Sequence, residues 1–67
     1  MFHKRLNETR KNAGITAQQM ADWLGIELRS YRNYESGDRE PSFAMLVKIA
    51  NKLNVSTDYL LGRTDAP

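Results

Sequence analysis

The sequence predicts an all-α domain of five short helices. Four glycines each follow a stretch in which apolar residues recur at helical spacing, and a glycine at such a place commonly ends a helix in the left-handed conformation. Pro41 marks a further boundary, because proline disfavours helix at the preceding residue and fits well just ahead of a new helix. No segment alternates apolar and polar residues as a half-buried strand does. We therefore expect helices at residues 2–12, 17–24, 28–36, 43–53 and 57–61.

The expected helix starts carry capping signals of their own. Thr16 reads as the N-cap of the second helix, with Gln19 reaching back to complete a capping box. Ile15 and Met20 stand at the positions of a hydrophobic staple around this cap. The same staple spacing recurs ahead of the third and fifth helices, at Ile26 with Tyr31 and at Val55 with Leu60, where Ser56 is the expected cap.

Apolar residues at helical spacing are sufficient for one small core, which is expected for a single domain at residues 1–62 with a tail or linker at 63–67. A domain of this size buries only about 60% of the surface of its unfolded chain, so its stability is expected to be modest. We interpret Trp23 as a flank of this core, with a protein-contact site as the alternative. The core candidates are Leu6, Met20, Ala21, Leu24, Tyr31, Tyr34, Leu46, Ile49, Ala50, Leu53 and Leu60.

Composition excludes several classes of protein. The absence of cysteine excludes a disulfide framework and a cysteine-rich zinc site, and it suits a reducing cytoplasm. No run approaches the roughly 20 apolar residues of a membrane-spanning helix, and the N-terminus lacks the apolar centre of a signal peptide. We therefore expect a cytoplasmic protein without metal or other cofactor. The net charge of +2 permits a nucleic-acid partner without requiring one.

The segment from Ala17 to Ser36 carries the pattern that points to function. Ala21 is small where two helices must approach closely, and Gly25, four residues later, permits a sharp turn that a Cβ would obstruct. Ile26 fills the corner of the turn, and two tyrosines anchor the helix that follows. A small residue, a glycine four positions on and apolar residues at these offsets predict a helix-turn-helix.

Residues 15–37, 39–42 and 55–62 resemble the Cro/C1-type (XRE, lambda-repressor-like) family of helix-turn-helix regulators. The most specific pieces are YESGDREPS at residues 34–42 and DYLLG at residues 58–62, both at the family's spacing. The resemblance implies a five-helix lambda-repressor-like fold and a bacterial or phage transcriptional regulator, expected to be a repressor in the nucleoid. It also implies a homodimer that binds an operator with inverted half-sites.

The third expected helix separates its side chains into two faces at 100° per residue. Tyr31, Tyr34 and Glu35 share one side, and the opposite side presents Arg29, Arg32, Asn33 and Ser36. Arginine can bind guanine O6 and N7, asparagine can bind adenine N6 and N7, and either arginine could hold a phosphate instead. We expect base reading by Glu27, Leu28, Arg29 and Asn33 and a phosphate contact from Arg32.

Glu27 stands where the family usually has a serine or threonine cap. Its carboxylate could cap the helix or accept a hydrogen bond from cytosine N4, and the sequence leaves both interpretations open. Tyr31 is also bulkier than the isoleucine or valine usual at its position. Both departures bear on specificity.

Phosphate contacts are expected at both ends of the helix-turn-helix. At the start of the second helix, Thr16, Ala17 and Gln18 offer backbone N–H groups and a helix dipole that attract an anion. Thr16 could equally serve only as a cap, or serve in both roles. Ser36 and Arg39 are the candidates beyond the recognition helix, with an ordinary surface loop as the alternative.

Glu35 falls on the inward side of the third helix, where an unpaired carboxylate would be costly. The family resemblance implies that Arg10 of the first helix is its partner. One interpretation is a purely structural ion pair, and the other leaves Arg10 near the phosphates as well. On the last helix, Tyr59, Leu60 and Leu61 are consecutive large apolar residues, so Tyr59 and Leu61 are expected at a dimer interface while Leu60 enters the core.

Other function classes are disfavoured. His3 is the only histidine and lies near the terminus, and the carboxylates show no catalytic pairing, so we do not expect an enzyme. A protein-interaction module on the same fold, or an antitoxin component, is the alternative, since Asp22 and Glu27 place acidic groups near the expected DNA face. No small-molecule site is evident. Salt-dependent duplex binding would separate these readings.

Overall fold

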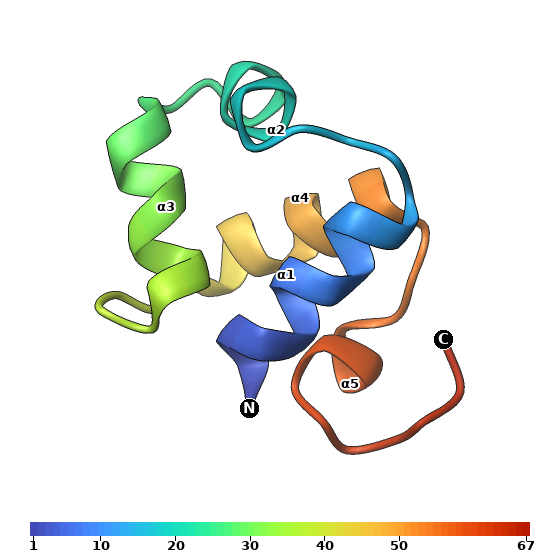
Figure 1. The fold of residues 1–67 in the computed structure, drawn as a ribbon. Coiled ribbons are helices and arrows are strands. Elements are labelled where there is room, and N and C mark those ends of the chain that lie inside the picture. The colour runs from blue at the N-terminus through green and yellow to red at the C-terminus, as the bar shows by residue number, and fades with distance from the viewer.

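The computed structural model describes residues 1–67 and contains five helices and no strand. They are α1 (Phe2–Asn12), α2 (Ala17–Leu24), α3 (Leu28–Ser36), α4 (Phe43–Leu53) and α5 (Thr57–Leu60). The all-α prediction is confirmed, and the helix bounds agree except that the last helix ends one residue earlier, at Leu60. None of the five helices has the length and apolar character needed to span a bilayer. Figure 1 shows α3 on one side of the molecule and the C-terminus on the other.

Side-chain caps fix the starts of three helices. The Thr16 hydroxyl accepts the Gln19 N–H at 3.1 Å while the Gln19 carbonyl oxygen accepts the Thr16 N–H at 2.8 Å, which confirms the capping box at α2. Ser56 caps α5 by accepting the Tyr59 N–H at 3.0 Å, also as predicted. Ser42 caps α4 by accepting the Met45 N–H, a role not predicted from the sequence, in which Pro41 was the only boundary signal noted here.

The turn between α2 and α3 depends on the backbone conformation of Gly25. Gly25 has φ +73°, and the N–H groups of Gly25 and Ile26 donate to the carbonyls of Asp22 and Ala21 in the Schellman arrangement. The space that a Cβ would occupy at Gly25 is empty, so a Cβ would disfavour this turn through the strain of a positive φ and not through contact with neighbouring atoms. Glycine is favoured here because its positive φ is unstrained. Asn54 performs the same conformational role at the end of α4, with φ +58°.

The core is the one that the helical spacing predicts. Its nine buried apolar residues are all among the candidates, and Tyr34 and Leu46, the remaining two, are partly buried and pack against it. Tyr31 is the largest fully buried side chain and the only buried residue of α3. The interpretation of Trp23 as a flank of the core is wrong: its side chain is 46% exposed, and its ring lies 5.3 Å from Lys52 Nζ.

The last residues fold back against the helices. Arg5 of α1 stacks over the Tyr59 ring at 4.3 Å and donates to the Thr64 carbonyl at 3.2 Å. The carbonyl of Pro67 accepts the Ser56 N–H at 3.0 Å. Residues 63–67 therefore lie along α1 and α5, on the side of the molecule away from α3 (Figure 1).

Candidate nucleic-acid interface

The outward face of α3 presents polar groups that the rest of the protein does not use. Arg29 and Arg32 are exposed, and none of the ion pairs of the molecule involves either of them. Asn33 is half-buried, and its backbone carbonyl accepts the Arg39 N–H at 3.2 Å. This face therefore offers two guanidinium groups and a carboxamide to an external partner.

Glu27 and Leu28, the other two residues predicted to read bases, differ from each other in exposure. Glu27 stands at the N-cap position and is exposed, but its side chain makes no capping hydrogen bond, so the capping interpretation is wrong. Leu28 is partly buried and packs against the core. Leu28 therefore packs the start of α3 against the core, whereas a residue that contacts bases is expected to point outward.

The N-terminus of α2 is open to an anion. The Thr16 hydroxyl accepts a hydrogen bond from Gln19 and still has its own hydrogen to donate. Backbone N–H groups in the first turn of a helix have no helical acceptor, and the first turn of α2 contains no acidic residue. Ala17 packs partly against the core, so its contribution would come from its backbone, while the exposed Gln18 side chain donates to Asp22 at 2.8 Å.

The loop after α3 is held in shape by local contacts. Ser36 Oγ lies 3.2 Å from the Asn33 carbonyl and 3.0 Å from Asp38 Oδ2, and it accepts the Asp38 N–H. Gly37 has φ +88°, and the His3 ring lies 3.2 Å from the position that a Cβ would take there. Ser36 thus orders the loop, and the exposed side chain of Arg39 emerges from it.

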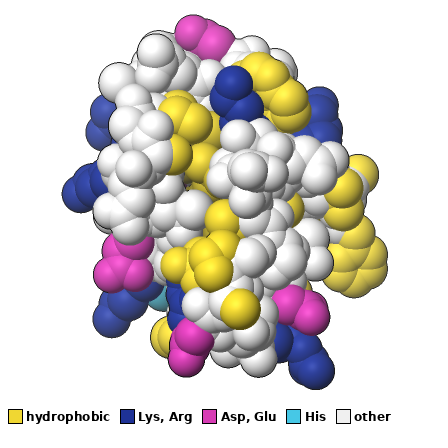
Figure 2. Space-filling view, turned by 90° about the vertical axis from the view of Figure 1, so that its right-hand side faces the viewer, with side chains coloured by type: hydrophobic (Ala, Val, Ile, Leu, Met, Phe, Trp, Pro, Cys, Tyr) yellow, Lys and Arg dark blue, Asp and Glu magenta, His cyan; other side chains and the backbone are white.

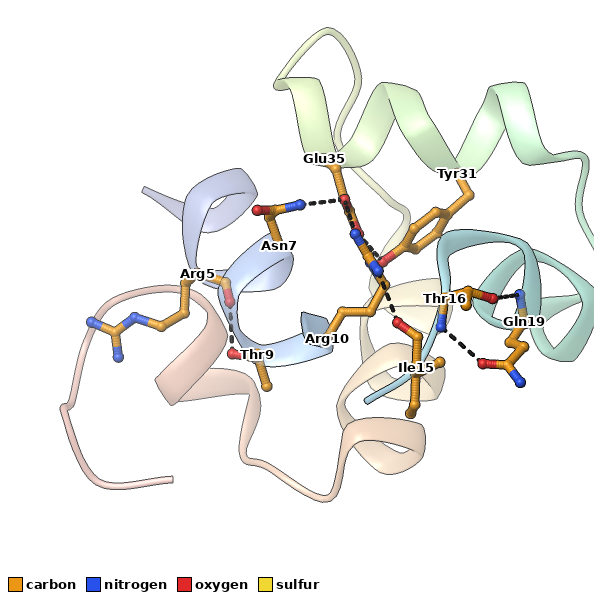
Figure 3. A network of polar contacts seen from close by, with 9 residues as sticks. All are labelled: Arg5, Asn7, Thr9, Arg10, Ile15, Thr16, Gln19, Tyr31 and Glu35. Atoms are coloured by element: carbon orange, nitrogen blue, oxygen red, sulfur yellow. Dashed lines mark hydrogen bonds and ion pairs between the residues drawn. The ribbon is translucent and has the colours of Figure 1, made fainter. Parts of the chain in front are cut away.

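The inward face of α3 differs from the outward one, because Glu35 and the Tyr31 hydroxyl are both hydrogen-bonded within the protein (Figure 3). Glu35 Oε2 receives the Arg10 Nε–H at 2.5 Å and the Tyr31 hydroxyl, while Oε1 receives Arg10 Nη2 at 3.1 Å and Asn7 Nδ2 at 2.7 Å. The Arg10 and Glu35 side chains are each 11% exposed. Arg10 and Glu35 therefore form a nearly buried ion pair with two further donors.

The hydrogen bonds in this cluster set its protonation. Burial alone would raise the pKa of Glu35, but the donors Arg10, Tyr31 and Asn7 outweigh it and hold that pKa below its ordinary 4.5. The hydrogen bond to Glu35 raises the pKa of Arg10. Burial, followed by the bond to Glu35, raises the pKa of Tyr31. The cluster is an ionised pair with a neutral tyrosine.

Arg10 also donates through Nη1 to the Ile15 carbonyl at 2.8 Å. All three nitrogens of the Arg10 guanidinium group therefore donate to Glu35 or Ile15 within the protein. This engagement favours the structural ion pair over the phosphate contact that was the other interpretation of Arg10. Two members of the cluster, Asn7 and the Tyr31 hydroxyl, were not predicted from the sequence. Helical spacing could have found both, since Asn7 lies three residues before Arg10 and Tyr31 lies four before Glu35.

An apolar groove of about 160 Å³ lies at the junction of α1, α4 and the end of α5. Leu61, 45% exposed, lines it together with Phe2, Pro41 and Phe43, and the Phe43 side chain is 89% exposed. Tyr59, the other expected dimer residue, is half-buried with Arg5 stacked on its ring. The exposure of Phe43 was not predicted from the sequence.

The face opposite α3 has no continuous basic surface. Figure 2 shows hydrophobic side chains among neutral polar surface there, with acidic and basic side chains interspersed around the edge.

A family profile described as a helix-turn-helix domain matches residues 3–65, nearly the whole of this geometry. The chain belongs to the XRE-type helix-turn-helix family. It is 47% identical over 66 residues to the SPbeta prophage-derived uncharacterized HTH-type transcriptional regulator YonR of Bacillus subtilis, covering 98% of this chain and 61% of that protein. It is 50% identical over 60 residues to the cryptic phage CTXphi transcriptional repressor RstR of Vibrio cholerae, covering 90% of this chain and 54% of that protein.

Solved structures agree with this family assignment. The master regulator for biofilm formation SinR, in complex with DNA, superposes with a TM-score of 0.82 at 27% identity, covering 91% of this chain and 98% of that one. The lambda-repressor-like fold is thus confirmed. The chain spans between about half and three fifths of the length of the two curated relatives.

Proposed function

We propose that this helix-turn-helix domain is a double-stranded DNA-binding transcriptional regulator that reads its operator with the outward face of α3. The observation that carries the proposal is that Arg29 and Arg32 are exposed without an ion pair on a helix that packs against α2, whose first turn contains no acidic residue. The names of the two relatives, one an HTH-type transcriptional regulator and the other a transcriptional repressor, support the same function and favour repression.

In this proposal α3 enters the major groove, which is wide enough to admit one helix. Arg29 and Asn33 contact base edges, and Glu27, free of any capping bond, is the candidate acceptor for cytosine N4. The protein anchors itself on the sugar–phosphate backbone at both ends of the motif. The phosphate contacts are the N-terminus of α2 at Thr16, Ala17 and Gln18, and the cationic or polar groups Arg32, Ser36 and Arg39.

Selection of bound sequences from a random duplex library tests this function. We expect one sequence family to be enriched, with log affinity for it falling linearly with log salt as phosphate counterions are released. A duplex of scrambled sequence is the control and should bind more weakly at every salt concentration. Failure to enrich any sequence, or binding that is indifferent to salt, would remove the proposal.

We propose further that the regulator binds as a homodimer through the apolar groove at Leu61. Exposed apolar surface of this kind is commonly covered by a partner, and Phe43 extends it along α4. A two-fold axis through this surface would place two copies of α3 in successive major grooves, about 34–36 Å apart. Leu61→Glu should abolish the dimer mass in solution and the cooperativity of operator binding, and unchanged values would contradict the assignment.

The alternative, a protein-interaction module on the same fold, has one observation in its favour. Trp23 is 46% exposed and lines an open cleft of about 550 Å³ with Lys52 and the turn between α1 and α2. If the library selection yields no sequence, this cleft is the surface where substitutions should be made first.

A further inference from the structure

A single hydrogen-bonded network joins the two parts of the proposed DNA interface. Arg10 lies at its centre, with Nε and Nη2 on Glu35 of α3 and Nη1 on the carbonyl of Ile15. Ile15 is the residue directly before Thr16, the N-cap of α2. One guanidinium group therefore ties the base-reading helix to the segment that begins the phosphate-binding helix (Figure 3).

The carboxylate of Glu35 is saturated by this network. It accepts four hydrogen bonds, which is about the number of acceptor sites a carboxylate has. Tyr31 supplies one of them from within α3, one helical turn before Glu35. The hydroxyl therefore restricts the carboxylate to the orientation in which both of its oxygens face α1.

Apolar packing holds α3 against the core, because Tyr31 is buried and Leu28 and Tyr34 are partly buried against it. The hydrogen bonds of Glu35 add directional contacts to α1, and these restrict the rotation of α3 about its own axis more narrowly than apolar packing does. Side-chain atoms on a helix lie about 5 Å from its axis, so a rotation of about 10° displaces them by about 1 Å. A displacement of that size takes a bidentate hydrogen bond outside its distance range of about 2.7–3.2 Å.

We propose that Tyr31 is a positioning residue for base reading, which acts through Glu35 and Arg10 to hold α3 in register with the N-terminus of α2. This inference rests on the proposed function. It assigns to the Tyr31 hydroxyl a role in sequence discrimination that is separate from the contribution of its ring to the core. Asn7, which holds the other oxygen of Glu35 from α1, serves the same positioning.

Tyr31→Phe tests the proposal because it removes the hydroxyl and keeps the ring. The measurement is the ratio of affinities for the selected operator and a scrambled duplex of equal length, well below the melting temperature of each variant. We expect the ratio to fall by about fivefold or more, as weakening one bidentate base contact would cause. Tyr34→Phe is the matched control on the same helix, outside the network, and should keep the ratio within about twofold.

The proposal would be overturned if Tyr31→Phe retained the ratio within about twofold, including the case in which affinity for both duplexes falls by the same factor, as a merely structural role predicts. If Tyr31→Phe does not fold, the same ratio of affinities is measured for Asn7→Ala. A fall of about fivefold would support the proposal, and a ratio retained within about twofold would overturn it. A parent protein without any preference for the operator would refute the proposed function itself. If the parent prefers the operator and the variants keep that preference, only the role of the network would be refuted.

Discussion

The two faces of α3 differ in how their polar groups are satisfied. On the inward face, Glu35 is nearly buried against Arg10 of α1, and every acceptor site of its carboxylate is occupied. On the outward face, Arg29 and Arg32 are exposed and belong to no ion pair. One helix of nine residues therefore carries a saturated polar cluster and a set of unused cationic donors on opposite sides.

The difference separates residues that hold the domain together from those that are free to bind. A buried charge must be paired and hydrogen-bonded to be tolerated, so the composition of the inward face follows from folding. Exposed and unpaired arginines contribute little to folding, and their placement on one side of the helix-turn-helix is what indicates a ligand. Substitutions on the two faces should accordingly affect different measurements.

The largest expected effect is on stability, from Glu35→Ala. Removing the carboxylate leaves Arg10 nearly buried without its partner, which costs about 3 kcal/mol, at the lower end for a buried pair because water reaches its edge. Urea unfolding measures the loss. Glu8→Ala, an exposed carboxylate on α1, is the control and should change stability by less than about 0.5 kcal/mol. Equal losses in the two variants would place Glu35 outside any stabilising pair.

The next effect separates capping from DNA binding at Thr16. Aspartate caps a helix as well as threonine does, so Thr16→Asp should leave the unfolding free energy nearly unchanged. Its carboxylate would stand where a phosphate is proposed, and operator affinity should fall by about tenfold, the loss of one charge-assisted hydrogen bond. Ser56→Asp makes the equivalent change at the cap of α5 and should not alter DNA binding. Undiminished affinity in Thr16→Asp would rule out a phosphate site at α2.

A smaller effect is expected at the turn that sets α2 against α3. Gly25→Ala should cost about 1 kcal/mol, because a left-handed conformation is strained for alanine while the space around the new Cβ is open. Gly14→Ala is a matched control, since Gly14 has the same φ of +73° and equally open surroundings. Thermal melts compare the two. A much larger loss at Gly25 than at Gly14 would mean that crowding, rather than backbone strain, selects glycine in this turn.

The smallest effect concerns acid pH. The folded state lowers the pKa of Glu35 below its ordinary 4.5, so the unfolded chain binds more protons and the stabilisation is present above that pH. The stabilisation by ionised Glu35 should be lost as the pH falls below 4.5 and passes through the lowered pKa. Glu35→Gln lacks this titration, so its stability should approach that of the parent at acid pH. A constant difference between the two proteins from neutral to acid pH would contradict the assignment.

Much of the fold could be predicted because local signals agree with the core. The caps at Thr16 and Ser56 and the apolar positions from Leu6 to Leu60 each follow from spacing along a single helix. Trp23 could not be placed this way, since spacing alone does not say whether a large residue at the edge of an apolar stripe has a helix to pack against. Gly25 was correctly predicted in the turn, but whether backbone strain or neighbouring atoms would exclude a Cβ depends on tertiary structure, and the surrounding space proves to be open.

The candidate site was predictable where it depends on one helix and less so where it depends on contacts between helices. The outward orientation of Arg29 and Arg32 follows from helical periodicity. The contact of Arg10 with the Ile15 carbonyl depends on the path of the chain after α1, and the groove beside Leu61 depends on how α4 and α1 meet. Such features arise from tertiary packing and leave no periodic signal in the sequence.

The most direct test of the account compares Arg29→Ala and Asn33→Ala with Arg32→Ala, each on one selected operator and one scrambled duplex over a salt series. We expect the first two to lose about 1–3 kcal/mol of discrimination at particular operator positions. Arg32→Ala should weaken binding to both duplexes alike and flatten the slope of log affinity against log salt by about one. If Arg29→Ala and Asn33→Ala instead lower both affinities equally, the outward face of α3 does not read bases, and the central claim is contradicted.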